Sequence, residues 1–377
     1  MTSVLIFIDS LTCGGAEKSL VSLMPFLVER GYDISLMLRK RGGIFERYLP
    51  SDIKVFEFPF KPRCRRELLY SAKIRLPWLR KRHTAETYWK CIGKHMPSLD
   101  DQFDVAIAYQ QGFPTFYVAE KIKARKKICW VNTDLKAAGY SADFCRPFYS
   151  GFDRIVAVSD ILRDSVIYPQ YCPEKDKILT CWDILNESLI RKLALEKTHR
   201  EKAAGKTDIV TVGRLVPSKG YDLAIRAAMI LKKRGLDFVW HFIGGGGLLA
   251  ELHKMADENG LSENIMIEGE MFNPYPYMAA CDIYVQTSRF EGFGLTVAEA
   301  KILGKAIVST GFPMVHHQLR NNHNGIIVEI TPEGIADGIF NLVNNPKLKQ
   351  SLEHQVSQEH NTTAETESRK VFSLIEQ

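Results

Sequence analysis

The 377-residue sequence lacks the features that would tie it to a membrane span, a metal or a dinucleotide. No apolar run approaches the roughly 20 residues of a membrane-spanning helix, and the first residues show neither a basic leader nor a small-residue cleavage site. Eight cysteines are scattered without a Cys-x-x-Cys pair or a histidine at metal-ligand spacing. We therefore expect a cytoplasmic protein with reduced, mostly buried thiols and no bound metal.

Acidic residues are in short supply only in the first half of the chain. The first 180 residues carry 29 Lys and Arg against 20 Asp and Glu, whereas the remainder carries 21 against 24. An excess of positive charge in one half suggests contact with an anionic surface, which would be phospholipid, a lipid-phosphate substrate or nucleic acid.

The positive charge is densest in residues 61–94, where eleven Lys or Arg face two Glu and alternate with aromatic and aliphatic residues. This composition is typical of a helix at an anionic membrane interface, here the inner face of the cell membrane. A solvated helix of the first domain fits equally well. Nucleic acid is disfavoured, because no nucleic-acid motif accompanies the charge.

Short apolar runs alternate with helical patterns along the chain. They predict strands at 4–8, 34–38, 105–109, 127–131 and 154–159, and again at 209–212, 238–243, 265–267, 283–286, 306–309 and 325–328. This alternation, interrupted by a polar stretch at 187–206, predicts an α/β protein with two doubly wound, Rossmann-like domains. We place the domains at residues 1–182 and 183–360. We interpret the tail, 361–377, as a helix that packs back on the first domain.

One glycine-containing turn follows the first strand of each predicted domain. Gly14 and Gly15 precede a helix, where backbone N–H groups can approach an anion, although such a turn also serves simply to join two elements. The turn at 213–220 adds Arg214 and Lys219, whose planar fork and point charge suit the oxygens of a diphosphate. Cations in an ordinary surface loop are the alternative.

A third glycine run, at 244–247, does not fit the dinucleotide fingerprint Gly-x-Gly-x-x-Gly, because positions 249 and 250 are Leu249 and Ala250. An NAD-type oxidoreductase is therefore disfavoured. We expect these glycines to let the chain pass close to a neighbouring loop or a ligand.

The most specific segment is 288–300, in which Glu291 and Glu299 bracket a glycine turn between a strand and a helix. Backbone N–H groups at 293–295 can bind a phosphate, and each carboxylate can accept two hydroxyls of a sugar ring. The residues between the two glutamates begin with Gly292, Phe293, Gly294 and Leu295.

Together these motifs resemble glycosyltransferase family 4, the retaining nucleotide-sugar transferases of GT-B fold. The resemblance is strongest over 209–328 and thin between 40 and 125. It implies that the first domain holds the acceptor and the second the nucleotide sugar, with the reaction in a cleft between them.

The resemblance also implies roles for individual residues. Arg214 and Lys219 would grip the diphosphate and stabilise the departing nucleotide without a metal, Glu291 would hold the transferred sugar, and Glu299 would bind the ribose. Backbone near Met271 and Phe272 would meet the base, whose identity the side chains leave open, and we expect UDP. The remaining implied donor-binding residues are Gly14, Gly15, Gly292, Phe293, Gly294 and Leu295.

Two positions depart from the family pattern. Asn132 stands where the family commonly has a histidine that orients the donor sugar, and an amide cannot carry the charge of an imidazolium. A front-face mechanism, in which the leaving phosphate takes the acceptor proton, needs no protein base. His317 beside Gln318 replaces an acidic residue, a change without a functional account in the sequence.

These observations lead to one main hypothesis and one alternative. The main hypothesis is a retaining glycosyltransferase that moves a hexose or N-acetylhexosamine from a nucleoside-diphosphate sugar to a glycan or lipid-linked acceptor in polysaccharide or lipopolysaccharide synthesis. Its catalytic residues would be Glu291, Arg214, Lys219 and Asn132. The alternative is a non-catalytic subunit that binds nucleotide sugar or glycan and whose site has degraded at Asn132.

Overall fold

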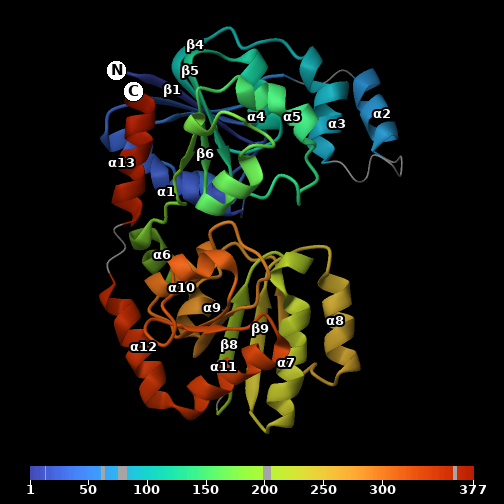
Figure 1. The fold of residues 1–377 in the computed structure, drawn as a ribbon, viewed down its shortest axis with the longest axis vertical. Coiled ribbons are helices and arrows are strands. Elements are labelled where there is room, and N and C mark those ends of the chain that lie inside the picture. The colour runs from blue at the N-terminus through green and yellow to red at the C-terminus, as the bar shows by residue number, and fades with distance from the viewer. Residues whose placement is uncertain (13, 61–63, 75–82, 198–204, 360–362) are drawn as a thin grey trace. The chain divides into compact units, whose positions relative to one another are not determined.

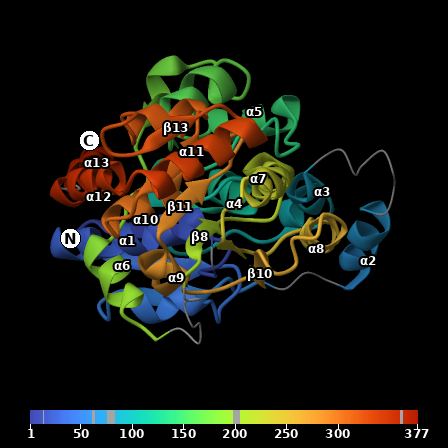
Figure 2. The same cartoon turned by 90° about the horizontal axis from the view of Figure 1, so that it is seen from below.

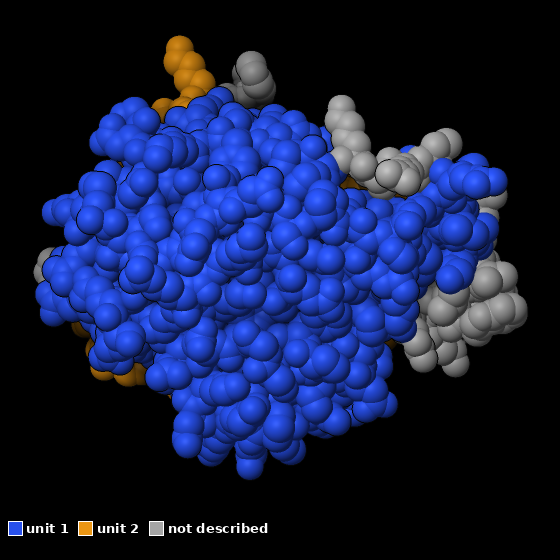
Figure 3. Space-filling view, turned by 90° about the horizontal axis from the view of Figure 1, so that it is seen from above, with its two compact units in different colours: residues 1–185, 362–377 blue, residues 186–361 orange. Residues whose placement is uncertain are grey.

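The structure, a computed structural model, describes residues 1–12, 14–60, 64–74, 83–197, 205–359 and 363–377. The chain forms two compact units. The first comprises Met1–Leu185 with Thr362–Gln377, and the second comprises Asn186–Asn361 (Figure 3). The division thus lies at 185–186, where 182–183 was expected, and the C-terminal residues belong to the first unit.

The described part of the first unit contains one sheet of seven parallel strands in the order β3-β2-β1-β4-β5-β6-β7 (Figure 1). Strand β1 is apolar and buried from Val4 to Ile8, as expected for a parallel strand covered on both faces. Strands β3 and β7 are short and were not predicted. The strands are β1 Ser3–Ile8, β2 Asp33–Leu38, β3 Lys54–Glu57, β4 Gln102–Ala108, β5 Lys123–Val131, β6 Arg154–Ala157 and β7 Ile178–Thr180. The helices are α1 Gly15–Glu29, α2 Cys64–Lys73, α3 Thr84–Cys91, α4 Phe113–Lys121, α5 Ala142–Ser150 and α13 Thr363–Glu376.

Helix α13 packs on α1 and closes the first unit (Figure 1). Its apolar side chains Val371 and Leu374 are buried. The Glu367 carboxylate accepts a hydrogen bond from the backbone N–H of Trp182 at 2.9 Å. Glu376 accepts one from the Tyr32 hydroxyl at 2.8 Å. The last helix therefore completes a unit whose other elements come from the first half of the chain.

The described part of the second unit contains one sheet of six parallel strands in the order β10-β9-β8-β11-β12-β13. All six were predicted from the sequence. Its core joins the apolar face of α7, α8 and α11 to the sheet. The strands are β8 Thr207–Val212, β9 Phe238–Ile243, β10 Ile265–Gly269, β11 Ile283–Gln286, β12 Ile307–Thr310 and β13 Ile326–Val328. The helices are α6 Glu187–Ala194, α7 Tyr221–Lys233, α8 Leu249–Glu258, α9 Tyr275–Ala280, α10 Leu295–Ile302, α11 Pro332–Asn344 and α12 Pro346–Gln358.

Both sheets are doubly wound, which confirms the predicted α/β class. The strand order reverses between β1 and β4 in the first sheet and between β8 and β11 in the second. In open α/β sheets, ligands bind beyond the carboxyl ends of the strands at such a reversal. The turn with Gly14 follows β1, the turn at 213–220 follows β8, and Glu291 follows β11. The topology therefore brings the motif loops to the two positions where a ligand is expected.

The basic segment 61–94 is described in part, since residues 61–63 and 75–82 lie outside the described residues. Helix α2 leaves Leu68 and Leu69 exposed, by 65% and 57%. Helix α3 buries Trp89, so its aromatic side chain belongs to the core. The two helices lie side by side, with the rings of Tyr70 and Tyr88 5.3 Å apart (Figures 1 and 2).

The structure also shows the character of the helices and the state of the cysteines. Within the described ranges, none of the helices has both the length and the apolar character needed to cross a bilayer. The cysteines whose side chains are described are all free and buried, as the sequence predicted; they are Cys91, Cys129, Cys145, Cys172, Cys181 and Cys281.

Candidate functional site

Two loops meet at the strand reversal of the second unit. Gly220 ends the turn after β8 with a positive φ of 69°, and a Cβ atom there would lie 2.1 Å from the carbonyl oxygen of Thr287. The Thr287 hydroxyl donates to the carbonyl oxygen of Lys219 at 2.8 Å. Glycine at 220 therefore lets the loop after β8 lie directly against the loop after β11.

This contact brings together two residues that are 72 positions apart. The Lys219 ammonium donates to Oε2 of Glu291 at 2.5 Å. Only 19% of the Lys219 side chain and 8% of the Glu291 side chain are exposed. A charge-assisted hydrogen bond of this length is stronger than one between neutral groups, and it holds the two side chains against each other.

The second oxygen of Glu291 is held by neutral donors. Its Oε1 accepts hydrogen bonds from Nε2 of Gln286 at 2.7 Å and from the Ser288 hydroxyl at 2.6 Å. Gln286 also donates to Ser288 at 2.8 Å, which closes a ring of three side chains. The sequence singled out Glu291 but gave no signal for Gln286.

A second ion pair ties the same two loops together on the outer side. Both guanidinium NH groups of Arg289 bind Asp222, at 2.8 and 2.6 Å, and one of them also donates to the carbonyl oxygen of Pro217. The hydrogen bonds from Arg289 hold the pKa of the Asp222 carboxyl below its usual value. This bidentate contact keeps the Lys219 turn in place against the Glu291 loop.

The glycine turn before α10 has the conformation that the sequence suggested. Gly294 has φ 89° and caps α10, while Gly292 and Leu295 are half-buried and Phe293 is buried. The Gln318 side chain donates to the carbonyl oxygens of Phe293 and Gly294. Gln318, which stands beside the unexplained His317, therefore braces this turn.

Glu299 lies one turn into α10 and is fully buried. The Tyr275 hydroxyl, at the start of α9, donates to its Oε1 at 2.8 Å. A ribose that binds this carboxylate therefore has to reach a buried group and share it with Tyr275.

The remaining predicted donor residues of the second unit surround the 213–220 turn or follow β10. Arg214 is exposed and forms no ion pair with any residue in the described ranges. A Cβ on Gly244 would lie 1.9 Å from the carbonyl oxygen of Gly213, so the glycine run does pass close to a neighbouring loop, as predicted. Met271 and Phe272 are half-buried in the loop after β10.

The first unit carries its own predicted residues at the reversal between β1 and β4. Gly14 and Gly15 stand at the N-terminus of α1, and a Cβ on Gly14 would lie 2.0 Å from the Glu17 carboxylate. Asn132 follows β5, and its side-chain NH2 donates to the carbonyl oxygen of Tyr109 at 3.0 Å. Its buried amide oxygen has no hydrogen-bond partner among the described residues. Asn132 is therefore fixed on its donor side and offers an acceptor.

Beside Asn132 lies a buried network that no sequence motif signalled. The hydroxyls of Ser19 and Tyr109 are 3.2 Å apart, and Ser19 also accepts from the backbone N–H of Ile184. Burial raises the pKa of the Asp183 carboxyl to about 7, while its hydrogen bond with Ser19 acts in the opposite direction. An acid that titrates near neutral pH thus lies at the end of the first unit.

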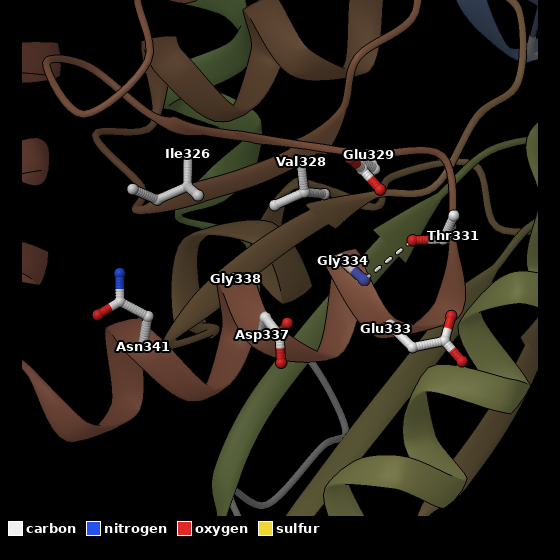
Figure 4. A pocket seen from close by; sticks show the side chains of 9 residues that line it. All are labelled: Ile326, Val328, Glu329, Thr331, Glu333, Gly334, Asp337, Gly338 and Asn341. Carbon is white, nitrogen blue, oxygen red and sulfur yellow. Dashed lines mark hydrogen bonds between the residues drawn. The ribbon is translucent and has the colours of Figure 1, made fainter.

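A pocket of about 550 Å³ lies between β13 and α11 (Figure 4). Three carboxylates line it, from Glu329, Glu333 and Asp337, and Asp337 pairs with Arg234 at 2.7 Å. Its acidic lining disfavours an anionic ligand such as a nucleotide. None of the lining residues is one that the sequence predicted for the site.

Most of the second unit matches a family of known proteins. Residues 195–359 match the family described as "Glycosyl transferases group 1". The lipopolysaccharide core biosynthesis glycosyltransferase LpsE of Rhizobium meliloti is 28% identical over 163 residues, which are 43% of this chain and 47% of LpsE. The poly(ribitol-phosphate) alpha-N-acetylglucosaminyltransferase of Staphylococcus aureus is 28% identical over 174 residues, 44% of this chain and 35% of that protein. The chain thus spans about half or less of the length of these relatives.

The fold of this chain resembles that of solved structures. The crystal structure of Anabaena HepE in complex with UDP and glucose matches 99% of this chain and 100% of its own, with a TM-score of 0.71 and 18% sequence identity. The chain therefore has the GT-B fold of glycosyltransferases, as the sequence predicted.

Proposed function

We propose, starting from the group 1 glycosyl transferase domain of the second unit, that this protein moves a sugar from a nucleoside-diphosphate sugar to a glycan or glycolipid acceptor. The setting would be synthesis of a cell-surface polysaccharide or lipopolysaccharide. The single observation that carries the proposal is the Lys219–Glu291 pair at the strand reversal, with the cation on one loop and the carboxylate on the other. The cation suits the oxygens of a diphosphate, and the carboxylate can accept hydrogen bonds from sugar hydroxyls.

In the proposed reaction the bond between the anomeric carbon and the leaving phosphate breaks, and the acceptor oxygen bonds to that carbon on the same face. The acceptor proton passes to the leaving phosphate oxygen. Lys219 and Arg214 stabilise the negative charge that develops on the leaving diphosphate, which is electrostatic assistance aimed at the transition state. Glu291 accepts sugar hydroxyls and orients the ring. We propose that the two cations perform this role without a metal, so transfer should persist in EDTA.

UDP is the nucleotide that we propose for the donor. HepE, which shares the fold, was crystallised with UDP and glucose, and this supports a uridine nucleotide as the first choice. The backbone near Met271 and Phe272 would contact the base, and Glu299 would take the ribose once Tyr275 shares its carboxylate. The sugar would be a hexose or an N-acetylhexosamine.

The test is transfer from a panel of UDP-sugars by the full-length protein and its variants. Lys219→Ala and Glu291→Ala should each lower kcat/KM by at least about 100-fold, because each loses a charged contact worth roughly 3 kcal/mol or more in the transition state. Lys233→Ala and Glu263→Ala, which alter exposed residues of the same unit, serve as matched controls. Rates near wild type in either site variant would refute the assignment.

We propose that the first unit takes the acceptor and that α2 meets an anionic lipid surface. The helix exposes Leu68 and Leu69 together with the cation Lys73, the combination that favours binding to an interface. Liposomes containing phosphatidylglycerol should sediment the protein at low salt and release it at high salt. Replacing both leucines by serine should weaken this binding, and equal binding to neutral vesicles would contradict the electrostatic account.

The comparisons do not favour the alternative of a binding-only subunit, since the two relatives described above are named as transferases. We accordingly propose that Asn132 is part of an intact catalytic site. Its fixed amide offers an acceptor to a hydroxyl of the donor sugar or of the acceptor.

A further inference from the structure

We propose that Gln286 is a positioning residue for sugar transfer, holding one oxygen of Glu291 in place while the other is handed from Lys219 to a hydroxyl of the donor sugar. This inference rests on the proposed function. Gln286 is the last residue of β11, only 2% exposed, and it belongs to no motif that the sequence revealed.

Every hydrogen-bonding position of the Gln286 amide is filled. Its Nε2 donates to Glu291 and Ser288, at 2.7 and 2.8 Å. Its Oε1 accepts from the hydroxyls of Tyr284 and Thr296, at 2.6 and 3.0 Å. A buried amide with two donors and two acceptors engaged has one position in which all four contacts hold.

The orientation of this amide is fixed by chemistry as well as by distance. An ionised Glu291 can only accept hydrogen bonds, so the group that faces it must be the NH2 of Gln286. The opposite orientation would set two acceptor oxygens against each other. Thr296 stands in the first turn of α10, so Gln286 links the Glu291 carboxylate to that helix as well as to its own strand.

The two oxygens of Glu291 are held in different ways. Oε1 has two neutral, buried donors, Gln286 and Ser288, which a diphosphate attracts less strongly than it attracts a cation. Oε2 has Lys219, a cation on a flexible four-carbon side chain that can also bind the diphosphate. When Lys219 turns to the phosphate, Oε2 loses its partner and becomes available to a sugar hydroxyl, while Oε1 keeps the carboxylate from turning.

The backbone around Gln286, which anchors the Glu291 carboxylate, is also fixed. The Thr310 hydroxyl donates to the carbonyl oxygens of both Gln286 and Ser288, at 3.2 and 2.6 Å. The loop that carries Glu291 is thus held from β12, independently of Lys219. The anchor can therefore stay in place while the cation moves.

The first test replaces Gln286 with Met, which keeps the length of the side chain but removes all four hydrogen bonds of the amide, including the two that its NH2 group donates. Affinity for UDP, which lacks the sugar, should stay within about twofold of wild type. The gain in affinity from UDP to the intact UDP-sugar should disappear, and kcat should fall by about 10- to 100-fold, the worth of one hydrogen bond to a charged group. A merely structural role would weaken UDP and UDP-sugar alike.

The matched control is Thr211→Val on the neighbouring strand β8. Thr211 is also buried, and its hydroxyl donates to the carbonyl oxygen of Val285 and accepts from the indole of Trp240. Its loss should also lower stability, because it deprives the carbonyl oxygen of Val285 and the indole N–H of Trp240 of a partner. Because neither of these hydrogen bonds involves Glu291 or Lys219, kcat should remain within about twofold of wild type.

A second variant, Gln286→Glu, keeps an acceptor for Tyr284 and Thr296 and so protects the fold. Two facing carboxylates share one proton, and the shared proton can replace the N–H bond to Glu291. The rate of the variant relative to wild type should therefore be higher at low pH, where the pair holds the shared proton, than at high pH, where the two carboxylates repel each other.

The possible results separate the two levels of the proposal. If the wild-type protein transfers no sugar from any donor, the proposed function fails and the role of Gln286 falls with it. If wild type transfers sugar but Gln286→Met keeps kcat and discriminates UDP-sugar from UDP as wild type does, only the positioning role is overturned. A pH profile of Gln286→Glu parallel to that of wild type would overturn it as well.

Discussion

Replacing Gly220 with alanine should lower both the stability of the second unit and its binding of UDP more than replacing Gly235 does. Helix α7 lies between two glycines with positive φ, Gly220 at 69° and Gly235 at 78°. Alanine in the left-handed region costs about 1–2 kcal/mol at either position. The two sites differ in space, because a Cβ at 220 would lie 2.1 Å from the carbonyl oxygen of Thr287, whereas a Cβ at 235 would meet nothing within 4 Å.

The close contact at 220 adds a second cost. The atom in the way is backbone, which cannot rotate aside, so the loop carrying Thr287 must move, and overpacking of this kind costs about 1–3 kcal/mol more. A unit of this size loses roughly 2–4 °C of midpoint for each kcal/mol. Gly220→Ala should therefore melt roughly 2–12 °C below Gly235→Ala.

The same displacement should disturb function. Thr287 holds the carbonyl oxygen of Lys219, and the loop continues to Glu291, so a shift at 287 pulls both ends of the ion pair. Thermal unfolding with and without UDP measures stability and binding together, since a ligand at 100 times its Kd adds about 2.7 kcal/mol. Gly235→Ala should keep the UDP-induced shift, and Gly220→Ala should lose it. Equal midpoints and equal UDP shifts in the two variants would refute the role given to this contact.

Three other results are expected. Asn132→His should not raise kcat, because the Asn132 amide is already fixed by Tyr109; a tenfold gain in a transfer assay would instead indicate a degraded site. Asp183→Asn should gain stability over wild type as pH rises from about 4 to about 7, because the folded-state pKa of Asp183 is raised to about 7 and its charged form is disfavoured in the fold; a pH-independent difference between the two denaturation curves would contradict this. Glu376→Gln should lower the unfolding midpoint only slightly, because its ion pair with Arg30 is half exposed. Truncation before α13 should instead unfold the first unit by uncovering its core, and limited proteolysis distinguishes the two outcomes.

Much of the fold could be predicted because the signals are local. The alternation of apolar strands and helical patterns is encoded in neighbouring residues, and it placed all six strands of the second sheet. The short edge strands β3 and β7 were not predicted, because four and three residues are too few to show a period. The motif loops were placed correctly after β1, β8 and β11, since parallel strands bring their carboxyl ends to one edge.

The structure brings some of the predicted site residues together. Lys219 and Glu291 lie together, and the glycines at 244–246 pass close to a neighbouring loop, as the sequence suggested. Glu299 is fully buried and accepts a hydrogen bond from Tyr275. That contact could not be read from the sequence, since the position of Tyr275 depends on how α9 packs against α10.

The sequence by itself determined the two α/β units, the chemistry of their loops and the free, buried state of the described thiols, because these follow from composition and from short-range patterns. Only the tertiary structure decided which side chains meet. The partners of Glu291 come from a strand end and from a loop 72 residues away, and Gln286 and Gln318 gained their roles through contacts that no spacing rule contains. The physical reason is that hydrogen bonds act over about 3 Å, so they depend on strand order and on one glycine's fit against a neighbouring carbonyl, which the chain acquires only on folding.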